Sequence, residues 1–211
     1  MKNFIEEQKI FNEIKEKFNN IKYEKNIDEF KLLIKKLFLN YDPAINENKF
    51  ITGHVAEILF ALLLKSFNFK VKIRGSNNDG YDLEINNLNF SLKTLSKPKS
   101  SIRLKNIHGT NNEYVFNYST IVIELGTGIY YFDPSNIKEQ NIIFKKSSDG
   151  FDINWKDVNK VINLYNTKIE INNFPSKKEL YKENEFLKKT ASQDVCNNLL
   201  ENYSKILNKY L

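Results

Sequence analysis

The sequence predicts an α/β or α+β domain in which a mixed or antiparallel sheet lies between helical segments. Apolar residues recur with a helical period up to about residue 67 and with a strand period of two from about residue 70. A helical pattern returns near the C-terminus, from about residue 179. With 211 residues, 41% of them hydrophobic and 27% charged, the chain is expected to form one globular domain.

Two amphipathic helices are predicted within the first 40 residues, each with its apolar residues on one face. The second helix is expected to end at Asn40-Tyr-Asp-Pro43, because the residue before a proline leaves the α region. The two apolar faces consist of Phe4, Ile5, Phe11, Ile14 and Phe18, and of Phe30, Leu33, Ile34, Leu37 and Phe38.

A third helix is predicted from about Thr52 to Phe67, with Thr52 as its N-cap. It is apolar around much of its circumference, so it is expected to pack against a sheet. Glu57 is an acid among apolar neighbours on this helix, and it needs a polar partner if it faces the sheet. The alternative is that Glu57 lies on an exposed stripe with His54 and Lys65.

Strands and hairpins are predicted between residues 71 and 155. Period-two segments occur at 71–73, 82–85, 90–95, 120–125, 129–132, 141–144 and 151–155. Turn-like sequences at 86–89, 126–128 and 147–150 join consecutive strands. Helices follow at 179–189 and 195–211. We expect a single domain, 1–211, with N-terminal helices (1–45), a core (50–170) and C-terminal helices (175–211), and residues 172–175 are the best candidate boundary.

Composition narrows the function classes. The net charge is +6 and the pI is near 9.1, so a polyanion is an acceptable partner. The single Cys196 excludes an internal disulfide framework and a Cys-based zinc site, and two histidines cannot build a His-rich metal centre. No signal peptide is apparent, and the longest apolar stretch, 58–64, is too short to span a bilayer. We therefore expect a cytoplasmic protein without a membrane partner.

Polar side chains are predicted to gather on one face of two neighbouring strands. Residues i and i+2 share a face, which groups Asp82 with Glu84 and Ser91 with Lys93. A four-residue loop at 86–89 would place Asp82 opposite Lys93 and Glu84 opposite Ser91. Cross-strand Cβ atoms lie about 4.5–5.5 Å apart, so all four side chains would be within reach of one divalent ion.

This patch suits a hard cation. Mg²⁺ prefers oxygen ligands and commonly uses one or two carboxylates plus a substrate phosphate. A neighbouring lysine can position or deprotonate an attacking water, or offset charge in the transition state. Those are the parts needed to hydrolyse a phosphodiester. The alternative is a solvated strand face with a surface Lys–Asp salt bridge worth ~0–1 kcal/mol.

These residues resemble the PD-(D/E)XK nucleases, in particular the type II restriction endonucleases. The family pattern is a helix glutamate, an Asp at a strand start and a (D/E)-X-K triplet on the next strand. The matching pieces, within about residues 50–135, are Gly53-His-Val-Ala-Glu57, Asp79-Gly-Tyr-Asp82 and Ser91-Leu-Lys93. The resemblance implies a restriction-endonuclease-like mixed β-sheet flanked by helices, with helical N- and C-terminal extensions.

The resemblance also implies site roles. Asp82 would be the metal-binding acid, Lys93 the catalytic lysine, and Glu57 would complete the site from the helix. Ser91 departs from the pattern, because the family usually has an acid there; Glu84 or Glu57 would supply the missing charge. By family analogy the backbone carbonyl of Leu92 is a further metal ligand. The implied cofactor is Mg²⁺, for which Mn²⁺ can substitute.

A basic, hydroxyl-bearing segment follows the triplet and predicts contacts with DNA. Lysine and serine suit phosphates, whereas arginine can bind guanine with two hydrogen bonds. The alternative is an ordinary basic loop. The predicted DNA-binding residues are Arg74, Lys97, Lys99, Ser100, Ser101, Arg103, Lys105 and His108.

The expected function is a Mg²⁺-dependent type II restriction endonuclease that hydrolyses double-stranded DNA at a specific sequence. A symmetric target calls for a homodimer. A cognate DNA methyltransferase acting on the same site is a further expected partner. The alternatives are a repair or junction-resolving nuclease of the same fold, a DNA-binding protein whose site has decayed, as Ser91 permits, and an interaction protein without a nucleic-acid role.

Overall fold

The computed structural model describes residues 4–42, 45–74, 81–95, 101–104, 107–108, 115–136, 144–147, 150–175 and 192–211. These ranges combine helices with a mixed sheet, which confirms the predicted class. No helix in them is long and apolar enough to cross a membrane. The helical elements are α1 (Ile5–Phe18), the 3-10 helix η1 (Ile21–Tyr23), α2 (Glu24–Asn40), α3 (Asn46–Ser66), α5 (Trp155–Leu164), α6 (Ser192–Tyr203) and the 3-10 helix η3 (Leu207–Tyr210).

The main sheet has six strands in the order β1-β2-β3-β7-β8-β11. Its two central strands, β3 and β7, are parallel, and the other neighbours are antiparallel. The sheet is therefore mixed. Its strands are β1 (Val71–Ile73), β2 (Leu83–Ile85), β3 (Leu88–Leu95), β7 (Ser119–Glu124), β8 (Gly128–Phe132) and β11 (Lys168–Glu170).

Two smaller sheets accompany the main one. One is antiparallel in the order β4-β10-β9, and the other pairs β5 with β6. The β9–β10 pair confirms a hairpin here, but β9 begins at Phe144, where the predicted strand ends, and Ser147 and Gly150 of the predicted turn are paired strand residues. The strands are β4 (Ser101–Leu104), β5 (Ile107–His108), β6 (Val115–Phe116), β9 (Phe144–Ser147) and β10 (Gly150–Asn154).

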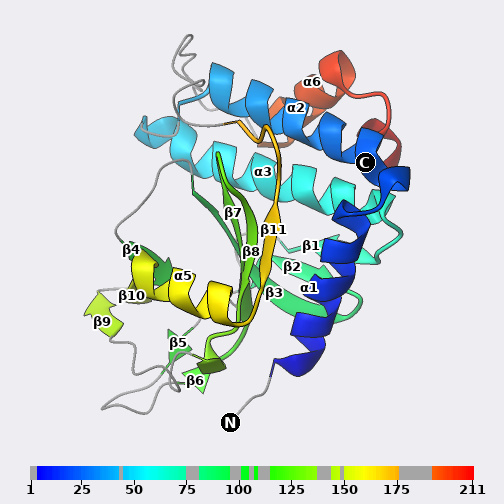
Figure 1. Cartoon of the computed structure of the whole chain (residues 1–211). Coiled ribbons are helices and arrows are strands. Elements are labelled where there is room, and N and C mark those ends of the chain that lie inside the picture. The colour runs from blue at the N-terminus through cyan, green and yellow to red at the C-terminus, as the bar shows by residue number, and fades with distance from the viewer. Residues whose placement is uncertain are drawn as a thin grey trace.

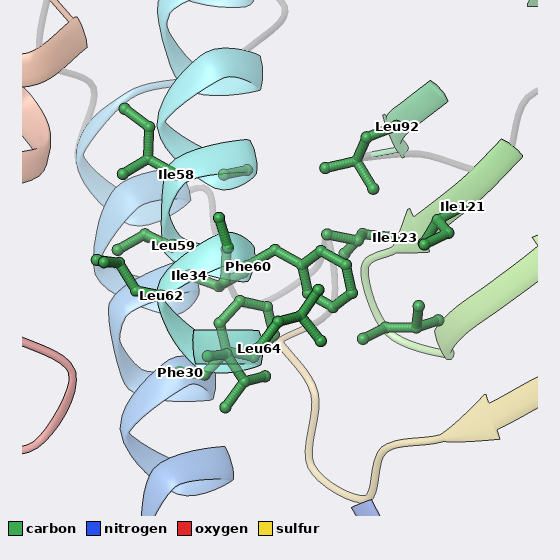
Figure 2. Close-up of a cluster of buried hydrophobic side chains, with 14 of the residues drawn as sticks. Phe30, Ile34, Ile58, Leu59, Phe60, Leu62, Leu64, Leu92, Ile121 and Ile123 are labelled. Carbon is green, nitrogen blue, oxygen red and sulfur yellow. The ribbon is translucent and has the colours of Figure 1, made fainter. Parts of the chain in front are cut away.

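Helix α3 lies between the main sheet and α2 (Figure 1). Figure 2 shows its side chains, Phe60 and Leu64 among them, between the α2 side chains and those of Leu92 and Ile123 from the strands. Burying a large aliphatic or aromatic side chain contributes about 1.5–3 kcal/mol. Because α3 is covered on two sides, its apolar pattern extends around most of its circumference.

The opposite face of the main sheet is buried as well. Ile121 and Ile123 of β7 belong to the cluster under α3, whereas Val122 belongs to a second cluster with residues of α5, β4 and β10. Side chains alternate between the two faces of a strand, so β7 contributes to both clusters. In Figure 1, α5 lies beside β4 and β10, on this second side. Strand β7 consequently carries apolar residues in succession.

Helix α3 begins six residues earlier than its predicted start at Thr52. Thr52 is not the N-cap: its hydroxyl lies inside the helix, is buried, and donates to the carbonyl of Asn48 at 2.8 Å. A threonine inside a helix can satisfy its hydroxyl in this way on the preceding turn. The cap position is Ile45, whose side chain makes no capping hydrogen bond.

The β2–β3 hairpin corrects the predicted register. Its turn has two residues, Asn86 and Asn87, with φ of 48° and 68°. Positive φ at both positions is required in a type I′ turn, and asparagine tolerates it. Leu83 therefore pairs with Phe90 and Glu84 with Asn89, so the predicted pairs of Asp82 with Lys93 and Glu84 with Ser91 are wrong. The register moves by two residues, an even number, so each side chain keeps its predicted face.

Some elements differ from the predictions or are additional to them. The β7–β8 hairpin is confirmed, but Trp155 begins α5 instead of ending a strand. Helix α5 and β11 were not predicted, although Asn154 caps α5 with its side chain on the N–H of Lys156. The predicted helix at 195–211 is present as α6, which ends at Tyr203, and a separate 3-10 helix, η3. The predicted segments at 141–143 and 179–189 lie outside the described residues.

The C-terminal turn is fixed by Glu29 of α2. Its carboxylate accepts the backbone N–H groups of Lys205, Ile206 and Leu207 and the hydroxyl of Ser204. Burial acts to raise the pKa of Glu29, but these hydrogen bonds outweigh it and lower the pKa below its ordinary value. Residues of α1, α2, α3, α6 and the main sheet share one hydrophobic cluster, so both ends of the chain pack on the central part.

Candidate active site

Asp82 directly precedes β2 and holds the start of that strand against β3. Its Oδ2 accepts the backbone N–H of Leu92 at 2.5 Å and the hydroxyl of Ser91 at 3.0 Å. The Nζ of Lys93 lies 3.5 Å from the same oxygen. Among the described residues all of these contacts fall on Oδ2, which leaves Oδ1 without a partner there.

Strand alternation explains why Ser91 and Lys93 reach Asp82. Phe90 and Leu92 point into the hydrophobic cluster under α3 and are almost fully buried. Ser91 and Lys93 point to the other face. The Lys93 side chain is 32% exposed and that of Asp82 is 28% exposed, so both lie at the rim of the sheet. An ion pair this open contributes only ~0–1 kcal/mol, so stability does not account for it.

The backbone of Leu92 turns toward the same rim. Its N–H donates to Asp82, whereas the carbonyl of Leu95 accepts from Leu125, the residue that follows β7. The backbone groups of even-numbered and odd-numbered residues on β3 therefore point to opposite edges of the strand. The N–H and C=O of one strand residue point to the same edge, so the carbonyl of Leu92 lies on the side of the Asp82 carboxylate.

Helix α3 contributes a hydrogen-bonded pair, His54 and Glu57. Nδ1 of His54 lies 3.1 Å from Oε2 of Glu57, and the side chains are 39% and 20% exposed. The hydrogen bond that His54 donates to Glu57 raises the pKa of His54, desolvation lowers it, and the charges of Glu57 and Asp82 raise it further. The charge of the Asp82 carboxylate therefore acts on the His54 imidazole.

Glu84 is engaged elsewhere. It pairs across the β1–β2 ladder with Lys72, whose Nζ lies 2.7 Å from Oε1 of Glu84. Glu84 shares the face of Asp82, as the alternation predicts, but its carboxylate is held by Lys72 on the side away from β3. Glu57 and Glu84, the two acids predicted to compensate for Ser91, each keep one oxygen without a partner among the described residues, and they differ in that Glu84 is held toward β1 by Lys72.

The residues present fit a magnesium ion of the partly hydrated kind. No cluster of three or more His, Cys, Asp or Glu side chains suited to a metal occurs in the described ranges. Mg²⁺ commonly takes only one or two carboxylates and completes its shell with water and phosphate oxygens. Oδ1 of Asp82, Oε1 of Glu57 and the carbonyl of Leu92 are hard oxygen atoms of the kind that such an ion would take.

The predicted DNA contacts are only partly described. Arg74 is exposed beside the site: its N–H donates to the carbonyl of Asp82 at 3.1 Å, and its guanidinium lies 5.5 Å from the centroid of the Tyr81 ring. Arg103 is also exposed, but it forms a two-pronged ion pair with Asp152 across β4 and β10. Ser101 is half-buried on β4. The backbone of His108 lies in β5, and Lys97, Lys99, Ser100 and Lys105 lie outside the described residues.

Comparison with known proteins gives a distant structural likeness. The chain matches no protein-family model and no curated protein. Among solved structures, a restriction endonuclease in complex with substrate DNA is similar over 72% of this chain and 80% of that one. The identity is 13% and the TM-score is 0.42, so the function has to be inferred from the site itself.

Two contacts of the site region were missed by sequence reasoning. His54 was treated as part of a possible exposed stripe, although its spacing of three residues from Glu57 on a helix signals a contact. The ion pair of Arg103 and Asp152 joins residues that are 49 apart in the sequence, and no local sequence pattern predicts it.

Proposed function

We propose that this protein is a Mg²⁺-dependent endonuclease that hydrolyses phosphodiester bonds of double-stranded DNA, in the manner of a type II restriction enzyme. The observation that carries the proposal is the convergence on one strand rim of the Asp82 carboxylate, the Lys93 ammonium and the Leu92 backbone, with the His54–Glu57 pair alongside. The net charge of +6 and the exposed Arg74 suit a polyanionic substrate.

In this proposal the side chains have distinct tasks. Asp82, Glu57 and the carbonyl of Leu92 would hold the ion, which when bound supplies charge neutralisation at the phosphate and a more acidic water. Lys93 would orient the attacking water or stabilise negative charge that develops on the phosphate in the transition state. Ser91 donates to Asp82 and so keeps the Asp82 carboxylate in place, and Arg74 would contact a phosphate.

Ser91 lowers the charge of the site relative to the nuclease pattern. An acid at this position would lie beside the Asp82 carboxylate, which Ser91 Oγ approaches to 3.0 Å, and the two would repel each other without a metal. With serine the second carboxylate has to come from Glu57. If Glu57 cannot serve, the same arrangement gives a DNA-binding protein without cleavage, which is the second candidate function.

Supercoiled plasmid DNA incubated with the protein and Mg²⁺ tests the proposal. We expect Mg²⁺-dependent double-strand cleavage into discrete fragments, and loss of cleavage in Asp82→Asn and Lys93→Met. A gel shift in Ca²⁺ that weakens with salt, with no cleavage in Mg²⁺ or Mn²⁺, would support the second candidate instead. Cleavage by both variants at the wild-type rate would refute the assigned site.

Further expectations follow from a symmetric target. A restriction enzyme of this kind would act as a twofold homodimer. Its host would protect the same sequence with a cognate DNA methyltransferase. Sedimentation of the protein with and without a cleaved duplex tests the dimer, and resistance of methylated plasmid tests the methyltransferase.

A further inference from the structure

His54 differs from the other close ion pairs that the described helices form at a spacing of three residues. In Lys9–Glu6, Lys31–Asp28 and Lys160–Asp157 at least one side chain is more than 60% exposed. In His54–Glu57 neither side chain exceeds 39%, and the carboxylate is 20% exposed. The three lysine pairs are ordinary surface pairs worth little to stability. The histidine pair lies on α3, the helix that shares a hydrophobic cluster with β3.

The direction of the His54 hydrogen bond can be assigned. A carboxylate only accepts hydrogen bonds, so Nδ1 of His54 carries the proton and donates it to Oε2 of Glu57. Oε1 then remains as the oxygen of Glu57 without a partner among the described residues. Nε2 of the ring makes no hydrogen bond with them either.

We propose that His54 is a positioning residue of this site: through Nδ1 it fixes the Glu57 carboxylate so that Oε1 is held ready for a divalent metal ion beside Asp82. The inference rests on the proposed function, because it presumes that Glu57 is a ligand. A glutamate side chain loses much rotamer freedom when it is ordered, and a prior hydrogen bond reduces what metal binding must still restrict. Partners of this kind typically change metal affinity 10–100-fold when they are removed.

Three substitutions separate the two ring nitrogens. His54→Asn places an amide N–H near the position of Nδ1, His54→Gln places one near Nε2, and His54→Ala removes both. Mn²⁺ binding is measured without DNA, by calorimetry or by the electron spin resonance of free Mn²⁺, together with the thermal midpoint. We expect Ala and Gln to weaken Mn²⁺ binding by about tenfold or more and Asn to stay within about threefold of wild type.

The control is Lys9→Ala, which removes the Lys9–Glu6 pair from α1 and should leave Mn²⁺ affinity unchanged. Wild-type affinity in His54→Ala would overturn the inference. Retention by Gln and loss in Asn would also overturn it, since Nε2 would then be the active nitrogen. If wild-type protein bound Mn²⁺ no better than Asp82→Asn, the proposed function would fail together with the inference. If the wild-type protein bound Mn²⁺ and cleaved DNA, and the His54 substitutions changed neither, the inference alone would be refuted.

Discussion

Glu29 and Asp82 are two carboxylates that both accept backbone N–H groups from a neighbouring element, but they differ in how many of their oxygens accept hydrogen bonds. Both oxygens of Glu29 accept, from Ser204, Lys205, Ile206 and Leu207. In Asp82 the contacts with described residues all involve Oδ2, and Oδ1 has no partner among them. The Asp82 side chain is partly exposed. A carboxylate whose two oxygens both accept hydrogen bonds from the protein serves the fold, whereas a carboxylate with one oxygen left over can also bind a ligand.

The same chemical change, carboxylate to amide, should therefore have opposite consequences at the two positions. Asp82→Asn is expected to have the larger effect on function, with a fall in plasmid cleavage on the order of 10²–10³-fold. Its free energy of unfolding should change by less than about 1.5 kcal/mol, because an amide oxygen can still accept from Leu92. Cleavage rates in Mg²⁺ and urea unfolding curves measure the two effects. A large loss of stability would place Asp82 in the same class as Glu29.

Glu29→Gln is expected to lower the free energy of unfolding by about 1–3 kcal/mol, since an amide cannot accept from all of the donors that converge there. Cleavage by the folded fraction should stay at the wild-type rate. Urea unfolding followed by circular dichroism gives the stability, and cleavage is assayed well below the unfolding temperature. A Glu29→Gln protein as stable as wild type would contradict the role of this carboxylate in fixing the C-terminal turn.

The stability difference between wild type and Glu29→Gln should depend on pH. The folded-state pKa of Glu29 is lowered, so its contribution is present above the unfolded-state value of about 4.3–4.5 and is lost as pH falls through the folded-state pKa. The two proteins should differ most near neutral pH and converge as the pH falls below the folded-state pKa of Glu29. Unfolding free energies at both ends of that range test this. A difference that grows in acid would show the opposite sign of the shift.

A smaller effect is expected in the turn that sets the register of Asp82. Asn87→Gly should raise the free energy of unfolding by about 0.5–1 kcal/mol, because glycine adopts the φ of 68° without a Cβ clash. Cleavage should be unchanged, since Leu83 still pairs with Phe90. Thermal melting and the plasmid assay measure both. Destabilisation would contradict the type I′ turn.

The fold was predictable where one pattern dominates. The apolar periodicity of α1 and α2 and the unbroken apolar surface of α3 follow from burial on one side or on both. Helix α5 was missed because Phe151, Ile153 and Trp155 alternate like a strand, and only the cap at Asn154 marks the change. The start of α3 was misplaced because Thr52 has the composition of a cap but bonds backward within the helix.

The sequence predicted which side chains of the candidate site share a face of the sheet, but it did not predict their contacts. Strand alternation grouped Asp82, Ser91 and Lys93 correctly on one face, whatever even number of residues the turn contained. The ion pair of Glu84 with Lys72 forms because β1 lies beside β2. The ion pair of Arg103 with Asp152 forms because β4 lies beside β10. Such neighbours are set by the tertiary arrangement, which periodicity does not encode.

Leu92 joins the interior of the protein to the candidate catalytic centre. Its side chain is packed under α3 and is 1% exposed, and its N–H donates a hydrogen bond to Oδ2 of Asp82. The carboxylate is thus tied to a residue that moves only when the central strands come apart. Heat should consequently abolish the proposed DNA cleavage in step with global melting, without an earlier phase in which a folded but inactive protein accumulates.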